Sequence, residues 1–241
     1  MKRFLIFAYG VISYLMFLVT FTYAIGFIGN IGVPRAIDGV VQAPLGKALL
    51  VNLALLAVFA VQHSLMARPG FKERWTRVVP RVAERSTYVL FSNLALILLM
   101  RFWEPMGGQI WNVTATPAKV ALYGVFGLGW GIVLLSTFLL NHFDLFGLRQ
   151  VWLQLRGKEY TPLRFGTPLL YKTVRHPLYL GFLLGMWATP TMTLAHLVFA
   201  AMSTAYMLVA IQLEERDLEA AHPEYRNYKK QVPMLVPTFR R

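Results

Sequence analysis

The chain has 241 residues, of which 56% are hydrophobic and 15% are charged, and its formal net charge is +13. This composition is too apolar for an ordinary soluble domain, in which about a quarter of the residues are charged. The chain contains no cysteine, which excludes disulfides, thiolate metal sites and a cysteine nucleophile.

Long apolar runs predict membrane-spanning helices, because about 20 apolar residues cross the hydrocarbon core. The first run follows Lys2-Arg3 and is too long for the apolar region of a signal peptide, so we interpret it as a retained span. Beyond Pro177 the apolar stretch is too long for one crossing, and Pro190 is expected to divide it into a helical hairpin. The predicted spans are residues 4–28, 45–66, 87–102 and 118–140, followed by a hairpin of 177–189 and 191–213.

The basic residues predict the orientation of these spans. With the spans drawn as above, 20 of the 24 Lys and Arg residues fall on one side, which the positive-inside rule identifies as the cytoplasm. Both termini and a polar C-terminal third would then be cytoplasmic, and the positive surface would meet anionic lipids rather than nucleic acid. The fourth predicted span also carries glycines that suit close helix packing: Gly124, Gly127, Gly129 and Gly131.

Few polar residues lie within the spans. His63 ends the second span, and we interpret it as an interfacial histidine with a hydrogen-bond partner. No span carries an acidic residue at mid-depth, which argues against a proton-coupled transporter.

Two polar clusters flank the later spans at the predicted inner surface. In the segment 141–150, His142 and Asp144 are either an acid–base pair or part of an interfacial helix end with aromatic anchors. A metal site built on His142 and His176 is rejected, because no third ligand has a suitable spacing. In the segment 171–181, Pro177 suits the first turn of a helix, whose free N–H groups and Arg175 would attract a carboxylate.

Two adjacent carboxylates, Glu214 and Glu215, follow the last predicted span. They are either a solvated helix end paired with nearby basic residues, or a site for a cationic or hydroxylated ligand.

The order of these motifs is similar to that of a known membrane-enzyme family. The run from Arg175 to Gly181, the run from Glu214 to Leu218, the segment 225–228 and two Val-Pro steps resemble the isoprenylcysteine carboxyl methyltransferase superfamily of integral-membrane methyltransferases. The segments 63–68 and 141–150 resemble one bacterial branch of that superfamily, the methanethiol S-methyltransferases, and with that branch the likeness covers nearly the whole chain.

The resemblance implies an S-adenosylmethionine site facing the cytosol over the last helices. Leu163–Gly166 would offer backbone contacts near the adenine, and Glu214 or Glu215 would hold a polar part of the cofactor. In the protein-methylating branch an arginine that helps to hold the substrate carboxylate precedes the binding glutamate by four residues, where this chain has Ala210 or Ile211. The implied cofactor-binding residues are Leu163, Arg164, Phe165, Gly166, Tyr171, Arg175, His176, Pro177, Leu178, Tyr179, Glu214 and Glu215.

Methyl transfer from a sulfonium to a thiol needs positioning and a thiolate, and little other acid–base chemistry. His142 is the candidate base, Asp144 would orient it, and Arg149 would stabilise the anion. An apolar pocket opening into the bilayer would suit a small, membrane-soluble thiol.

We therefore expect an all-α, polytopic membrane bundle of five to six helices, forming one domain over residues 1–241. Residues 1–140 would supply four spans, and residues 141–241 a cytosolic catalytic and cofactor-binding region. The expected reaction methylates methanethiol to dimethyl sulfide in the bacterial inner membrane, with no metal, nucleic acid or obligate protein partner. The alternatives are another lipid, isoprenoid or amine acceptor, or a non-enzymatic transporter or denitrification-associated protein.

Overall fold

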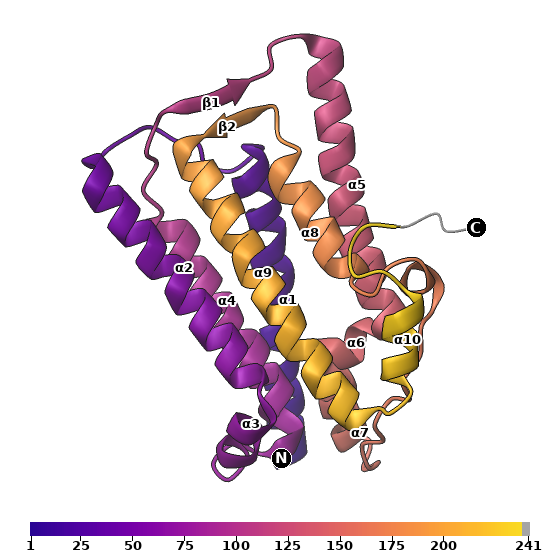
Figure 1. Ribbon diagram of the computed structural model, residues 1–241. Coiled ribbons are helices and arrows are strands. Elements are labelled where there is room, and N and C mark those ends of the chain that lie inside the picture. Colours follow the sequence, from indigo (N-terminus) through magenta and orange to yellow (C-terminus); the bar gives the residue numbers. More distant parts are fainter. Residues whose placement is uncertain (238–241) are drawn as a thin grey trace. The chain divides into compact units, whose positions relative to one another are not determined.

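The computed structural model describes residues 1–237; Arg240 and Arg241, which the predicted topology assigns to the inner side, lie outside this part. The described chain is mainly helical, with one small two-stranded sheet (Figure 1). Within residues 1–237, five helices are long and apolar enough to cross a membrane, which confirms the predicted helical membrane protein. The elements in order are α1 (Lys2–Gly29), α2 (Leu45–Ala67), α3 (Pro69–Trp75), η1 (Arg81–Ala83), α4 (Glu84–Phe102), β1 (Gln109–Asn112), α5 (Thr116–Leu140), α6 (His142–Leu145), α7 (Leu148–Leu155), η2 (Leu169–Lys172), α8 (Pro177–Trp187), β2 (Thr191–Thr193), α9 (Leu194–Ala221) and α10 (Tyr225–Gln231).

The chain forms two compact units, which are described separately. The first unit contains residues 1–108, 141–162 and 193–196, and therefore α1 to α4, α6 and α7. The second contains, of the described chain, residues 109–140, 163–192 and 197–237, and therefore α5, α8, most of α9 and α10.

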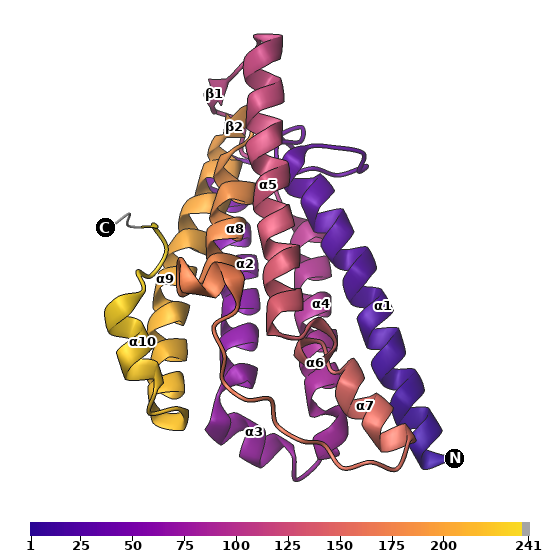
Figure 2. The ribbon, with the colours of Figure 1, turned by 90° about the vertical axis from the view of Figure 1, so that its right-hand side faces the viewer.

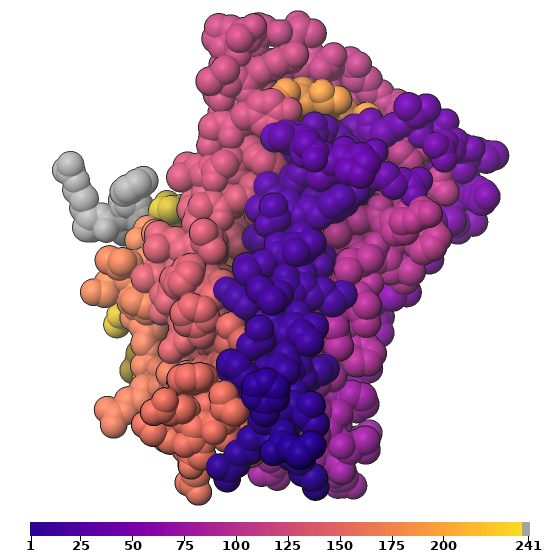
Figure 3. All heavy atoms as spheres, turned by 180° about the vertical axis from the view of Figure 1, so that it is seen from behind, coloured from indigo at the N-terminus to yellow at the C-terminus, as the bar shows by residue number. Residues whose placement is uncertain are grey.

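In the first unit, α1, α2 and α4 lie side by side, with α4 packed against both neighbours (Figure 1). The short helix α7 packs on α1 at Gly10, where an added Cβ would lie 2.6 Å from a methyl carbon of Val151. The opposite face of α1 runs along the molecular surface (Figure 3) and exposes apolar side chains such as Phe4, Ile12 and Val19. An exposed apolar helix of this length is expected where the solvent is lipid.

A buried polar contact fastens the loop between α1 and α2 to the start of α9 within the first unit. Asp38 pairs with His196 Nδ1 at 3.0 Å and accepts a hydrogen bond from the side chain of Asn30 at 2.7 Å. Thr193 donates its backbone N–H and its hydroxyl to Asp38, and its hydroxyl oxygen also accepts from the backbone N–H of His196. Thr193 is thereby an N-cap that begins α9 three residues after Pro190.

In the second unit, α5 and α8 approach closely (Figure 2). A Cβ on Gly129 would lie 2.7 Å from the carbonyl oxygen of Gly181, and one on Gly181 would lie 2.6 Å from the carbonyl oxygen of Gly129. A Cβ on Gly124, Gly127 or Gly131 would meet nothing within 4 Å. The predicted close packing of the fourth span is therefore made by one glycine of the four.

The hairpin predicted at Pro190 is present, but its second arm differs from the prediction. Helix α8 ends at Trp187, and Thr191–Thr193 forms a strand paired with β1 instead of helix. Helix α9 then continues to Ala221, eight residues past the predicted end at Leu213. The charged side chains after Leu213 end the apolar span without breaking the helix, so the span and the helix have different ends. The third predicted span also differs at its start, because α4 begins at Glu84 and the predicted span begins at Thr87.

Candidate functional site

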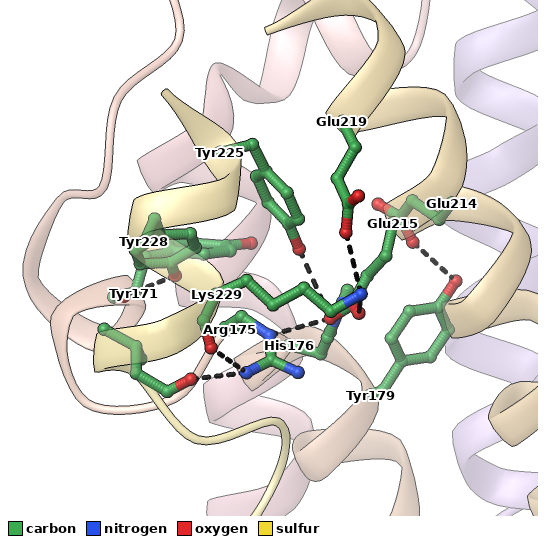
Figure 4. Close-up of polar contacts among 11 residues, drawn as sticks. Tyr171, Arg175, His176, Tyr179, Glu214, Glu215, Glu219, Tyr225, Tyr228 and Lys229 are labelled. Atoms are coloured by element: carbon green, nitrogen blue, oxygen red, sulfur yellow. Dashed lines mark hydrogen bonds and ion pairs between the residues drawn. The ribbon is translucent and has the colours of Figure 1, made fainter. Parts of the chain in front are cut away.

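The second unit holds a cluster of charged and aromatic side chains at one end of α9 (Figure 4). Glu214 and Glu215 come from α9, Arg175 and His176 precede the first turn of α8, and Lys229 comes from α10. Pro177 occupies the first helical position of α8, where its missing N–H is not needed. Three segments that are distant in the sequence therefore meet around the two glutamates.

Glu215 is the centre of this cluster and is 5% exposed. Its Oε1 accepts hydrogen bonds from Arg175 Nε at 2.7 Å and from the Tyr225 hydroxyl at 3.3 Å, and it lies 3.0 Å from His176 Nε2. Its Oε2 lies 2.9 Å from Lys229 Nζ. A buried carboxylate requires such partners, because an unpaired charge away from water is costly.

Arg175 also joins the cluster to the C-terminal segment. Its Nη1 donates to the backbone carbonyls of Lys229 and Val232 at the end of α10. The backbone N–H of Arg175 donates to the carbonyl of Pro233 at 2.8 Å, and that of His176 to Met234 at 3.1 Å. We call residues 232–236 the strap, because they run along the start of α8 and occupy these donors.

Glu214 has a different environment from its neighbour. It is half-buried, and its Oε2 accepts a hydrogen bond from the hydroxyl of Tyr179 at 3.1 Å. No ion pair is formed by Glu214 among the described residues. Among the described residues, the Glu214 carboxylate therefore has fewer bonded partners than the Glu215 carboxylate.

Aromatic rings close the site on the side of α10. Phe165 stacks on His222 with ring centroids 5.4 Å apart and meets the edges of Tyr225 and Tyr228. Burial, followed by the nearby Glu215 carboxylate, raises the pKa of Tyr225 well above its ordinary value. Burial also raises the pKa of Tyr228 to about 12. Both phenols are therefore neutral at physiological pH and act as hydrogen-bond donors.

The other predicted cofactor-binding residues of the second unit are arranged around this cluster. Tyr171 is buried, and its backbone carbonyl accepts from the Tyr228 hydroxyl. Burial and the charge of Glu214 raise the pKa of Tyr171. Leu163, Arg164 and Gly166, in the loop before η2, are exposed, and Leu178 on α8 is half-buried.

The predicted catalytic residues His142, Asp144 and Arg149 belong to the first unit. The carboxylate of Asp144 is bonded to Arg149 Nη1 at 2.8 Å and to the Tyr160 hydroxyl at 3.3 Å. His142 Nε2 instead lies 2.8 Å from the hydroxyl of Tyr14 on α1. The sequence gives no signal for Tyr14, because 128 residues separate it from His142 and it lies in the middle of an apolar run.

The prediction that His63 has a hydrogen-bond partner is confirmed. Its ring lies 2.8 Å from the Tyr88 hydroxyl and 3.1 Å from the Ser92 hydroxyl, and it stacks on Phe59. Among residues 1–237, no group of three or more His, Asp or Glu side chains is placed to hold a metal ion.

Comparison with known proteins identifies relatives over nearly the full chain. The chain is 57% identical over 238 residues to the methanethiol S-methyltransferase of Crocosphaera subtropica, covering 98% of this chain and 93% of that protein. It is also 57% identical to the methanethiol S-methyltransferase of Mycobacterium tuberculosis, covering 98% of each. A more distant relative is the membrane protein nurim of Rattus norvegicus, which is 32% identical over 207 residues, covering 80% of this chain and 78% of nurim.

No protein-family model matches the chain, and no solved structure does. The assignment therefore depends on the curated relatives, whose likeness covers 98% of this chain. The chain belongs to the methanethiol S-methyltransferase family.

Proposed function

We propose that this protein transfers a methyl group from S-adenosylmethionine to methanethiol, giving dimethyl sulfide. The observation that carries the proposal is the identity of 57% to two methanethiol S-methyltransferases over 98% of the chain. The five apolar helices make it an integral membrane enzyme. The bacterial inner membrane, with both termini in the cytoplasm beside the soluble donor, is the location that the basic residues favour.

The residues around Glu214 fit a cationic donor. Glu214 is half-buried and holds one neutral hydrogen bond, so its charge is available to a cation. Tyr179 beside it offers an aromatic face, which also attracts cations. When bound, S-adenosylmethionine supplies a methyl group on a sulfonium. Glu214 and Tyr179 would hold its cationic part, and Phe165 with its exposed neighbours Leu163, Arg164 and Gly166 would face the adenine.

Glu215 has a different proposed role. Its oxygens are surrounded by two cationic side chains, a histidine and a phenol, so it has little capacity left for a ligand. We assign it to holding Arg175, His176 and α10 in place. Of the two adjacent glutamates, Glu214 is therefore the one that we propose to contact the cofactor.

The first unit supplies the side chains for the acceptor. Burial lowers the pKa of His142, so its imidazole is neutral at physiological pH and is able to receive a proton. A groove of about 510 Å³ in the same unit is lined by Phe7, Val11, Phe143 and other apolar side chains, together with Asn141 and Arg149. Apolar walls suit a small thiol, and Arg149 is the candidate for stabilising its anion.

The whole chain is proposed to act as one catalytic domain, with residues 1–140 supplying four spans and 141–241 the catalytic region. Its two units share the helix α9, which begins in the first and continues in the second.

The direct test incubates purified protein in detergent with labelled S-adenosylmethionine and methanethiol and measures dimethyl sulfide in the gas phase. A panel of lipid, isoprenoid and amine acceptors run in parallel separates the rival acceptors. Isothermal calorimetry on His176→Ala and Glu214→Ala tests the donor site, for which we expect weaker binding in both. Unchanged affinity in both variants would refute the site, and no methyl transfer to any acceptor would refute the enzyme.

A further inference from the structure

The proposed reaction gives no role to the hydrogen bond between Tyr14 and His142 in the first unit. The hydroxyl of Tyr14 lies 2.8 Å from His142 Nε2, and the two rings meet edge to face with centroids 5.6 Å apart. His142 is 4% exposed. A phenol has one proton to donate and can also accept a hydrogen bond, so it can give its proton to the imidazole while receiving another.

The surroundings of this pair are aromatic. Phe17 stacks on Phe146 at 3.9 Å, and the rings of Phe143 and Phe146 lie 5.5 and 4.8 Å from the His142 ring. Such walls exclude water, which strengthens the hydrogen bond and disfavours a charged imidazole before reaction. The imidazole is therefore buried beside the half-buried Tyr14, in surroundings where an unassisted thiol would ionise poorly.

The charged groups nearby are already paired with other atoms. On α6 and α7, Asp144 and Arg149 form an ion pair, and Arg149 also donates to the backbone carbonyl of Thr161 at 2.9 Å. From α4, Arg85 donates to the carbonyl of Leu145 at 2.9 Å. Nε2 of His142 is instead hydrogen-bonded to the hydroxyl of Tyr14 on α1.

The position of Tyr14 also suits an apolar acceptor. Phe7 and Val11, which line the groove beside α6 and α7, precede Tyr14 by seven and three residues on α1. Residues with this spacing share one face of a helix. At its other side the groove is lined by Asn141 and Phe143, the two neighbours of His142 in the sequence.

We propose that Tyr14 is a catalytic residue that receives the thiol proton and passes its own proton to His142 Nε2. The inference rests on the proposed methyl transfer. The thiol S–H bond breaks toward the Tyr14 oxygen as the Tyr14 O–H proton moves to the imidazole. The sulfur electron pair forms a bond to the methyl carbon, and the sulfonium–methyl bond breaks to leave a neutral thioether. The imidazolium then releases its proton to water.

The test compares Tyr14→Phe with Tyr9→Phe, a matched change five residues earlier on α1, where the hydroxyl donates to Thr87 at 2.9 Å. We expect Tyr14→Phe to lower kcat by about 10²-fold at neutral pH, the range of general acid–base catalysis, with an unchanged Kd for S-adenosylmethionine. Tyr9→Phe should remain close to the wild type. The double variant of Tyr14→Phe with His142→Gln should lose no more than either change alone, because the two groups act as a unit.

A structural role is distinguished by the chemistry of the thiol. The defect of Tyr14→Phe should shrink as the pH approaches the pKa of the acceptor, and it should shrink for an aromatic thiol that ionises more readily. A defect of equal size at every pH and for every thiol would overturn the relay, as would full activity of Tyr14→Phe beside an active wild type. An inactive wild type would overturn the proposed function and the relay together.

Discussion

Replacing Glu215 by glutamine is expected to lower the stability of the protein, whereas replacing Glu214 by glutamine is expected to lower its affinity for the donor. The Arg175–Glu215 pair is buried, with side chains 10% and 6% exposed, and removing one partner of such a pair costs about 3–5 kcal/mol. Lys229 is 41% exposed, so its contact with Glu215 adds only about 0–1 kcal/mol. Glu215→Gln should therefore lower the free energy of unfolding by about 3 kcal/mol.

Glu214→Gln is the matched control at the next position. It leaves an oxygen to accept from Tyr179, so we expect a stability change within about 1 kcal/mol. If Glu214 contacts the cationic donor, the affinity of this variant for S-adenosylmethionine should be lower than that of the wild type by roughly tenfold or more. The reason is that a charge-assisted contact is worth about 1.5–3 kcal/mol.

Thermal unfolding in detergent and calorimetry with S-adenosylmethionine measure the two effects. For a chain of this size, a loss of 3 kcal/mol corresponds to a fall in Tm of about 6–12 °C. Glu215→Gln should show this fall, and Glu214→Gln should keep the wild-type Tm while binding the donor weakly. A Glu215→Gln variant with the Tm of the wild type, or a Glu214→Gln variant that unfolds at a lower temperature than Glu215→Gln, would refute the reasoning.

Three further predictions follow from the fold. Burial would raise the pKa of Asp38, but His196 and the side-chain hydrogen bonds from Thr193 and Asn30 outweigh burial and hold the pKa below its ordinary value. The stability that this carboxylate contributes is present above about pH 4 and is lost as the pH falls through the lowered pKa. Asp38→Asn should therefore flatten the acid limb of Tm against pH, and an unaltered limb would contradict this. Gly181→Ala should cost about 1–3 kcal/mol, because its Cβ would meet the backbone of Gly129, whereas Gly127→Ala should be neutral or stabilising by up to about 1 kcal/mol; equal Tm values for the two variants would argue against the packing. A reporter fused to the carboxyl end should be active only in the cytoplasm, and periplasmic activity would place the donor site on the wrong side.

The spans were predictable because membrane insertion depends on local hydropathy. Each long run of apolar residues became a helix, and Pro190 separated α8 from α9 as expected. The end of α9 was misjudged, since Leu213 marks the end of the apolar run and the charged residues that follow continue the same helix to Ala221. Strands β1 and β2 could not be predicted from the sequence, because each is only three or four residues long and they pair with each other although about 80 residues separate them.

The candidate site was predicted in part. The motif order placed Arg175, His176 and Glu215 in one site, and the structure brings these three side chains into contact. The different roles proposed for Glu214 and Glu215 could not be predicted from the sequence. They depend on which side chains, distant in the sequence, bind each carboxylate oxygen. The same limit applies to Tyr14, which no local pattern distinguishes from the other aromatic residues of α1.

The strap has a consequence for biosynthesis. Residues 232–236 hold the backbone donors of Arg175 and His176, and α10 supplies Lys229 to Glu215, so segments that follow α9 complete the charged cluster. A nascent chain would insert the five long apolar helices of the described residues before it could complete this cluster. If the proposed donor site is correct, a nonsense mutation or a proteolytic cut between α9 and the strap would leave an embedded protein whose donor site is incomplete.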